Sequence, residues 1–144
     1  EFRHRSWLDE HRELRREVLD ALKKRNVANV QIDGPGAPVS RVQTADHAYI
    51  RFHGRNYDIW FKGEDENDYR INRYDYLYSM EQLEGWKPVI VEARENAKSV
   101  RLYFNNHGRA KAVKNALQMM DLLSIPHREK EIRLQDQMKL GSYE

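Results

Sequence analysis

The stretch Ala48-Tyr49-Ile50-Arg51-Phe52-His53-Gly54-Arg55 decides the fold class of this chain. It is short, rich in aromatic and β-branched residues, and bounded by residues typical of turns, which indicates a β-strand. Side chains alternate along a strand, so Ile50 and Phe52 would share one face while Arg51 and His53 share the other. Because unpaired charge is costly to bury, we expect the face with Arg51 and His53 to border a groove or a ligand.

Strand and helix signals alternate along the whole sequence. We expect strands near residues 1–4, 27–33, 47–53 and 99–106, and helices from residue 6 or 7 to 25, from 79 to 97 and from 109 to 123. Ser79 and Gln82 have the spacing of a capping box, and Pro88 indicates a kink or a restart within the middle helix. Strands that alternate with helices indicate an α/β fold built from parallel βα units.

Every expected strand divides its residues between a polar and an apolar face. The polar set is Glu1, Arg3, Gln31, Asp33, Arg51, His53, Arg101, Tyr103 and Asn105. The apolar set is Phe2, Val30, Ile32, Ile50, Phe52, Leu102 and Phe104. An open doubly wound sheet is covered on both faces, so its strands are apolar throughout. The pattern therefore favours a closed (β/α) barrel with polar residues around its mouth.

Length and composition are typical of one soluble domain that extends over residues 1–144. Of the 144 residues, 40% are hydrophobic, and a net charge of +2 gives no strong preference for nucleic acid or membranes. The absence of cysteine excludes disulfides, thiolate nucleophiles and cysteine zinc sites. No apolar run approaches membrane-spanning length and no signal peptide is visible, so we expect a cytoplasmic protein with no membrane partner.

Four motifs occur in order along the chain. They are Glu1-Phe2-Arg3-His4-Arg5-Ser6-Trp7, Tyr49-Ile50-Arg51-Phe52-His53-Gly54-Arg55, Arg73-Tyr74-Asp75-Tyr76-Leu77-Tyr78-Ser79 and Tyr103-Phe104-Asn105-Asn106-His107. Together with Asn115-Ala116 they resemble the YecE-like family, known as domain of unknown function 72, up to about Leu123. The resemblance implies a TIM-type (β/α)₈ barrel and no established activity.

The family's N-terminal portion, with its own opening motif, has no counterpart in this sequence. A full barrel needs roughly 250 residues. The resemblance therefore implies the C-terminal half of a TIM-type barrel. We expect such a half to associate with its missing N-terminal half or with a second copy in a homodimer, because exposed strand edges invite association.

Two segments that follow strands could form an anion site. They are His53-Gly54-Arg55 and Asn105-Asn106-His107-Gly108-Arg109. The resemblance places them after barrel strands seven and eight, where many barrels bind phosphate. Free N–H groups at the start of the last helix, with Arg51, Arg55 and Arg109, are suited to an anion. Alternatively, the glycines only make turns and the arginines pair with carboxylates.

Histidines and carboxylates also gather at the expected strand ends. The set consists of Glu1, His4, Asp33, His53 and His107. Imidazole and carboxylate groups perform acid–base chemistry or hold a divalent metal, although the spacing matches no established metal motif. The alternative is a pair of structural salt bridges, Glu1 with Arg3 and Asp33 with Arg51.

Residues 55–78 form a long segment in which aromatic and basic residues are interleaved, and residues 124–144 form a tail with little pattern. A long loop after a barrel strand is often a lid. Its aromatic and basic side chains could stack bases and contact phosphates, or they could pack the loop onto the barrel. The acidic run at 64–68 argues against continuous contact with nucleic acid.

These patterns favour an enzyme that acts on a phosphate-bearing or otherwise anionic ligand, with phosphodiester hydrolysis as the first reaction to test. The catalytic candidates are His53, His107 and Asp33. The ligand-binding candidates are Glu1, Arg3, His4, Arg51, Arg55, Tyr74, Tyr76, Asn105, Asn106 and Arg109. Two alternatives stay open: a non-catalytic module that binds nucleic acid, and a fragment that is inactive without its N-terminal half.

Overall fold

The structure is a computed structural model that describes residues 1–36, 40–60 and 73–128. Its elements run in the order η1 (Arg5–Trp7), α1 (Arg16–Lys24), β1 (Val30–Asp33), β2 (His47–Phe52), α2 (Tyr57–Trp60), α4 (Met80–Glu84), α5 (Lys87–Asn96), β3 (Ser99–Phe104), η2 (Gly108–Ala110) and α6 (Lys111–Leu122). No helix in these ranges is long and apolar enough to cross a membrane.

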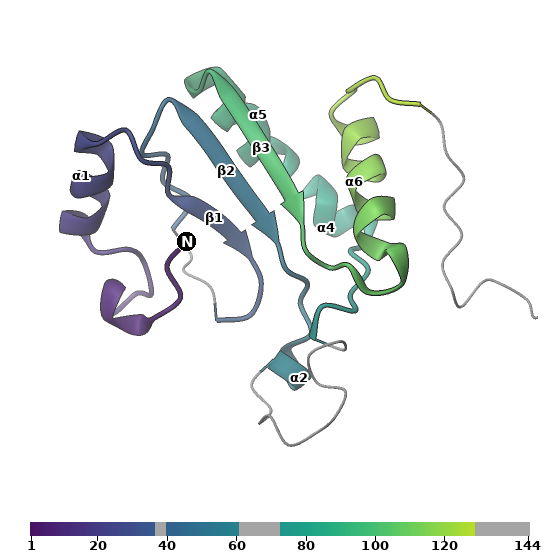
Figure 1. Cartoon of the computed structure of the whole chain (residues 1–144), viewed down its shortest axis with the longest axis horizontal. Coiled ribbons are helices and arrows are strands. Elements are labelled where there is room, and N and C mark those ends of the chain that lie inside the picture. The colour runs from purple at the N-terminus through teal and green to yellow at the C-terminus, as the bar shows by residue number, and fades with distance from the viewer. Residues whose placement is uncertain (37–39, 61–72, 129–144) are drawn as a thin grey trace, which may run out of the picture.

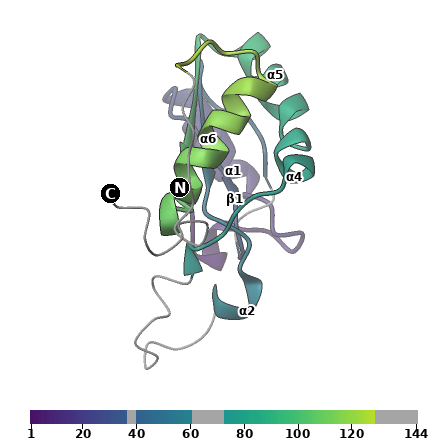
Figure 2. The ribbon, with the colours of Figure 1, turned by 90° about the vertical axis from the view of Figure 1, so that its right-hand side faces the viewer.

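The centre of the molecule is a parallel sheet with strand order β1-β2-β3. Helices α4 and α5 lie on one face of this sheet, as the side view in Figure 2 shows, and Met119 of α6 packs in the core on the same face. Figure 1 looks onto the other face, over which no helix of the described chain lies. The predicted α/β class with parallel strands is therefore confirmed.

The core lies between the sheet and the helices, and Phe52 is at its centre. The Phe52 ring stacks on Phe104 with centroids 4.5 Å apart and meets the edges of Tyr78 and Trp86 at 5.6 and 5.2 Å. Phe52 is fully buried, as is Ile50 two residues earlier. Burial of each such side chain contributes about 1.5–3 kcal/mol, so β2 is the strand that anchors the core.

The register of the sheet corrects the predicted faces of β1. Gln31 pairs with Ile50 and Asp33 pairs with Phe52. Paired residues of neighbouring strands project to the same face, so Gln31 and Asp33 lie on the helix-covered face. The prediction that they share a face with Arg51 is wrong, because residue type alone does not fix register.

The uncovered face of the sheet carries aromatic and charged side chains of β2 and β3. Tyr49 and Tyr103 stack there, with ring centroids 4.6 Å apart at 13°. Tyr103 is 42% exposed, and Arg101 beside it on β3 is also exposed. The predicted split between polar and apolar faces is confirmed for these two strands.

The N-terminal prediction is wrong in two respects. Residues 1–4 form no strand, and the first long helix begins at Arg16, not at residue 6 or 7. The His4 side chain caps the short η1 helix by accepting a hydrogen bond from the Ser6 amide at 3.2 Å. Asp9 then accepts the amides of residues 11 and 13, each at 2.9 Å, which stabilises a turn where the helix was expected.

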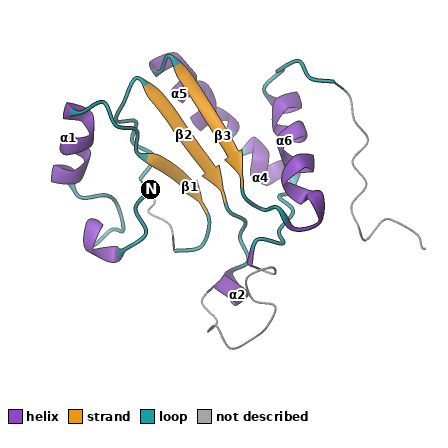
Figure 3. Ribbon diagram, in the orientation of Figure 1, coloured by secondary structure: helices purple, strands orange, loops and turns teal. Residues whose placement is uncertain are grey.

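The middle helix divides as Pro88 indicated. Ser79 and Gln82 form the predicted capping box, α4 ends at Glu84, and α5 starts at Lys87 with Pro88 in its first turn. A proline is tolerated there because its missing N–H would have no helical partner. Figure 3 shows the two helices as separate purple segments.

Several predicted boundaries move inward. Strand β1 begins at Val30 instead of residue 27, β2 ends at Phe52 instead of residue 53, and β3 ends at Phe104 instead of residue 106. Helix α6 begins at Lys111 instead of residue 109, because Arg109 and Ala110 adopt left-handed backbone angles, with φ of 53° and 61°. The chain thus turns sharply between β3 and α6.

Gly54 is expected to resist substitution. Its φ is +94°, and a Cβ there would lie 2.7 Å from the Tyr76 Cβ. We expect Gly54→Ala to lower the free energy of unfolding by about 2 kcal/mol or more in urea titrations, from backbone strain and steric overlap. Gly85→Ala is the control, because Gly85 has φ of −60° and room for a methyl group. Equal losses in both variants would contradict this account.

Candidate functional site

A pocket of about 250 Å³ opens beyond the carboxyl ends of β1 and β2. Its described lining includes Glu1, Arg3, His53, Trp60 and Tyr74. The loop that begins at Gly34 forms another wall. The carboxyl end of a parallel sheet is where α/β proteins place their ligands, so this is the candidate site.

Glu1 supplies the carboxylate among the described residues of the pocket, and it contacts two arginines and a histidine. It accepts hydrogen bonds from Arg3 Nε at 2.7 Å and Arg51 Nη1 at 2.5 Å, and its Oε1 lies 3.4 Å from His53 Nε2. Burial alone would raise the pKa of Glu1, but the two arginines hold that pKa below its ordinary value. Glu1 therefore carries a negative charge between two arginines, of which Arg3 lines the pocket and Arg51 does not, and the predicted Glu1–Arg3 pair is confirmed.

His53 is the most unusual side chain of the pocket. It is 4% exposed, and neither ring nitrogen has a hydrogen-bond partner among the described residues. Burial lowers the pKa of His53 and Arg51 adds to this, although Glu1 opposes it. The net shift favours a neutral imidazole, which has one nitrogen ready to accept a proton.

Gly34 makes room for this histidine. A Cβ at Gly34 would lie 3.1 Å from the His53 Cβ, closer than ordinary packing. The backbone after β1 can therefore approach the end of β2 only because residue 34 has no side chain. Gly34 and Trp60 were absent from the predicted site. The position of Gly34 directly after a predicted strand could have indicated its role.

An aromatic cluster separates the two candidate histidines. Tyr74 lies 6.1 Å from the His53 ring and stacks on His107 at 5.4 Å, while Trp60 meets Tyr74 at 5.4 Å. The His107 side chain is exposed, and its Nδ1 donates to the Asn105 carbonyl at 2.8 Å. Tyr74 thus belongs to the pocket as predicted, whereas His107 lies on the outer side of Tyr74.

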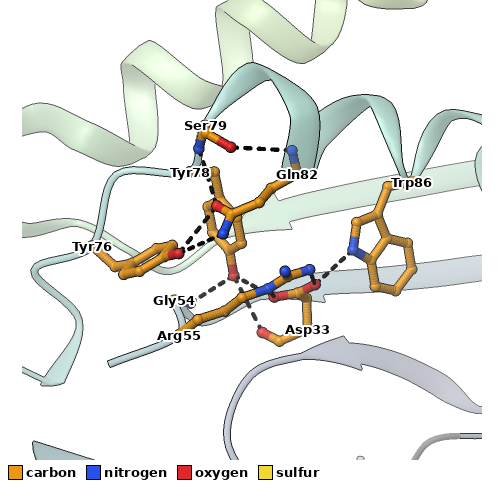
Figure 4. A network of polar contacts seen from close by, with 8 residues as sticks. All are labelled: Asp33, Gly54, Arg55, Tyr76, Tyr78, Ser79, Gln82 and Trp86. Atoms are coloured by element: carbon orange, nitrogen blue, oxygen red, sulfur yellow. Dashed lines mark hydrogen bonds and ion pairs between the residues drawn. The ribbon is translucent and has the colours of Figure 1, made fainter. Parts of the chain in front are cut away.

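Asp33 lies outside this pocket and has all its hydrogen-bonding capacity engaged. Its carboxylate accepts from Arg55 Nε and Nη2 at 2.8 and 2.5 Å, from the Tyr78 hydroxyl at 2.9 Å and from Trp86 Nε1 at 2.6 Å (Figure 4). Burial opposes ionisation, yet these donors hold the pKa of Asp33 below its ordinary value. Asp33 pairs with Arg55, so the predicted pair with Arg51 is wrong.

The other predicted anion-binding arginines also face carboxylates. Arg109 Nε lies 3.5 Å from an oxygen of Asp75, and Lys111 contacts the other oxygen at 2.7 Å. A Cβ at Gly108 would lie 2.6 Å from that second oxygen. The turn before α6 is therefore packed against Asp75, and the structure does not bring Arg109 or Arg55 to the pocket.

Four further predicted ligand residues have structural partners. Asn106 is fully buried, and its Nδ2 donates to the Tyr76 carbonyl and to Asn115, each at 2.8 Å. The Tyr76 hydroxyl bonds to Gln82. The amide of Asn105 donates to the Phe52 carbonyl at 2.7 Å, and His4 caps η1. None of these four residues lines the pocket.

The histidines and carboxylates expected at the strand ends do not form a metal centre. Among the side chains of that set, which all lie in the described residues, only those of Glu1 and His53 are in contact. Within residues 1–36, 40–60 and 73–128, no three histidine, cysteine, aspartate or glutamate residues gather as a metal ion would need. The described residues therefore supply no ready set of ligands for the divalent metal considered from the sequence.

Comparison with known proteins finds a matching family model and similar proteins in bacteria. The family model "Protein of unknown function DUF72" matches residues 1–139. UPF0759 protein YunF of Bacillus subtilis (strain 168) is 32% identical over 133 residues, which are 88% of this chain and 46% of that protein.

Solved structures agree with this assignment. A DUF72 family protein of Thermotoga maritima MSB8 matches 86% of this chain and 45% of its own, with a TM-score of 0.72 at 38% identity. One from Enterococcus faecalis V583 matches 92% of this chain and 50% of its own, with a TM-score of 0.75 at 26% identity. The chain spans about half the length of these relatives, and it belongs to the DUF72 family of proteins of unknown function.

Proposed function

We propose that the chain forms the C-terminal half of a (β/α)₈ barrel. Three observations support this: the strands are parallel, the helices cover one face of the sheet, and the relatives are about twice as long. In a closed barrel the uncovered face with Tyr49 and Tyr103 would become the interior. A cytoplasmic location is part of the same proposal.

We further propose that the pocket at the strand ends binds a small phosphate-bearing or otherwise anionic ligand, and that His53 acts on it. The observation that carries this proposal is the buried His53 ring, which lacks hydrogen-bond partners among the described residues. A buried polar group without a partner is costly, and such groups gather at functional sites. Arg3 and Arg51 beside it outnumber the single carboxylate of Glu1.

Hydrolysis of a phosphodiester is the reaction that these groups suit best. The oxygen of a water molecule bonds to phosphorus while one P–O ester bond breaks. His53 accepts a proton from that water and returns it to the leaving alcohol oxygen, so the imidazole is unchanged. Arg3 and Arg51 would stabilise the charge on the other phosphate oxygens.

The test is hydrolysis of bis(p-nitrophenyl) phosphate by the purified chain and its variants. We expect His53→Gln to lower kcat by about 10²–10⁴-fold. His127→Gln is the matched control, because His127 pairs with Asp121 on α6. Loss of activity in an Arg55 variant but not in His53→Gln would overturn the acid–base assignment.

One observation favours the second candidate, a non-catalytic module for nucleic acid. The rings of Trp60, Tyr74 and His107 form a continuous cluster, and Arg73 lies over Trp60 at 5.3 Å. Such rings can stack bases beside phosphate contacts. Binding of single-stranded DNA that weakens steeply with salt, without turnover, would support this candidate instead.

The third candidate, a fragment that needs its missing half, makes a prediction about assembly. The stacked Tyr49 and Tyr103 on the uncovered face would then drive association, since exposed apolar faces and strand edges recruit partners. Light scattering of the purified chain should show a species larger than a monomer. A well-folded monomer with hydrolase activity would exclude this candidate.

A further inference from the structure

Asp33 and the end of β2 are joined by a buried polar network, which Figure 4 shows from close by. Asp33 is 6% exposed and Tyr78 is 2% exposed, so water cannot replace these contacts at low cost. One carboxylate accepts hydrogen bonds from a guanidinium, a phenol and an indole. Because its lone pairs are occupied, Asp33 is unsuited to direct contact with a ligand in the pocket.

The same network holds three consecutive residues of the chain. The His53 amide donates to the Asp33 carbonyl at 2.8 Å, and the Gly54 amide donates to the Tyr78 hydroxyl at 2.7 Å. The Arg55 side chain then binds the Asp33 carboxylate through two nitrogens. The backbone on both sides of the His53 side chain is thus fixed to Asp33 or to its partner Tyr78.

Nothing comparable fixes the His53 ring itself. Its two nitrogens have no hydrogen-bond partner among the described residues, and the contact with Glu1 is 3.4 Å. The direction of a side chain depends on its backbone as well as on contacts of its ring. Among the described residues, hydrogen bonds therefore orient His53 only through the backbone that Asp33 and Tyr78 hold, while Gly34, Trp60 and Tyr74 line the pocket around its ring.

We propose that Asp33 and Tyr78 are positioning residues, which act from the helix-covered face of the sheet to hold the His53 imidazole in the pocket on the other side. This inference rests on the proposed function of His53. It replaces the direct catalytic role that the sequence favoured for Asp33 with an indirect one. It also explains why a carboxylate with all its acceptor sites occupied lies beside the end of β2, on the face of the sheet opposite the His53 ring.

Two donors to Asp33 provide a matched pair of variants. Tyr78→Phe removes the hydroxyl that donates to Asp33 and accepts from the Gly54 amide. Trp86→Phe removes a different donor to Asp33, and Trp86 makes no hydrogen bond to residues 53–55 in the described structure. Both variants weaken the network, but only Tyr78→Phe releases the backbone next to His53.

The readout is the His53 ring signal in proton–carbon NMR spectra, identified by its loss in His53→Gln and followed through a pH titration. In Tyr78→Phe we expect the signal to broaden or split and its midpoint to rise toward 6.5, because a loosened ring regains water. The charged groups that face the ring, namely Glu1, Arg3 and Arg51, are intact in both variants. In Trp86→Phe the His53 signal should stay as in the original chain even though the melting temperature falls.

Two results would overturn the inference: an unchanged His53 signal in folded Tyr78→Phe, or changes in both variants in proportion to their loss of stability. If Tyr78→Phe does not fold, Arg55→Lys is the second variant, since it keeps the charge but loses the two-nitrogen contact with Asp33. We expect it to move the His53 signal in the same direction. The titration needs no ligand, so it can succeed even where the proposed hydrolysis fails.

Discussion

Replacing Asp33 by alanine is expected to lower the free energy of unfolding by about 3–5 kcal/mol, as measured by urea denaturation at neutral pH. The variant leaves the Arg55 guanidinium without its carboxylate, and it removes the acceptor of the Trp86 indole and the nearer of the two acceptors of the Tyr78 hydroxyl. Each unsatisfied buried donor adds to the loss. We expect no other single substitution proposed for this chain to cost as much.

A double variant separates the cost of losing the Asp33–Arg55 ion pair from the cost of leaving the Arg55 guanidinium unpaired. In Asp33→Ala with Arg55→Met the stranded guanidinium is absent, so the double variant should be more stable than Asp33→Ala alone. The exposed pair of Asp46 and Lys98 is the control, and Asp46→Ala should change stability little because water screens that contact. An Asp33→Ala chain as stable as the original would contradict the network described here.

The same carboxylate predicts how stability depends on pH. Donors from Arg55, Trp86 and Tyr78 outweigh burial, so the pKa of Asp33 in the folded chain lies below the ordinary value of 3.8. The stabilisation is therefore complete above that value and is lost as the pH falls through the lower folded pKa. Asp33→Asn should flatten this acid limb of the stability curve, which urea titrations at several acidic pH values would measure.

Local signals in the sequence predicted the elements whose geometry depends on neighbouring residues. The alternation in β2 and β3, the Ser79–Gln82 capping box and the restart near Pro88 are all present in the structure. Each of these features is determined within a few residues, by side-chain period, a reciprocal hydrogen bond or a missing N–H. The position of β2 in the core followed from the same local pattern.

The faces of β1 could not be predicted in the same way. Gln31 and Asp33 are polar, yet both lie on the helix-covered face. For Asp33 the reason is that it finds donors from Arg55, Tyr78 and Trp86. Those partners come from segments up to 53 residues away in sequence. Polarity indicates an exposed face only when no distant partner satisfies the group, so a buried network reverses the prediction.

In the candidate site, too, distant partners decide where a polar side chain points. Glu1, Arg51 and His53 come together, but Glu1 does so from a segment that forms no strand. Only Arg51 and His53 lie together because of the alternation along β2 from which they were predicted to share a face. Arg55 and Asn106 were assigned to the site by their place after a strand, but both turn toward buried acceptors. Sequence therefore located the carboxyl ends of β1, β2 and β3 to within two residues, while the direction of each side chain beyond them depends on tertiary partners.

The largest expected effect on binding concerns His53 and sulfate. Sulfate is the probe because its charge does not change where a histidine titrates. Burial and Arg51 lower the pKa of His53 below 6.5, so the ring is neutral at neutral pH. An anion in the pocket favours the protonated ring, so the affinity for sulfate should rise as the pH falls through the His53 pKa.

We expect this rise to be about tenfold, which corresponds to a shift of one unit in the His53 pKa on binding. Calorimetric titration with sulfate across this pH range would measure it. His53→Gln should bind weakly with no such dependence, whereas His127→Gln should retain it, since His127 contacts Asp121 on α6. The charged groups that face His53 are Glu1, Arg3 and Arg51, and all three are unchanged in His53→Gln and in His127→Gln. An equal pH dependence in His53→Gln would place the anion elsewhere and remove His53 from the site.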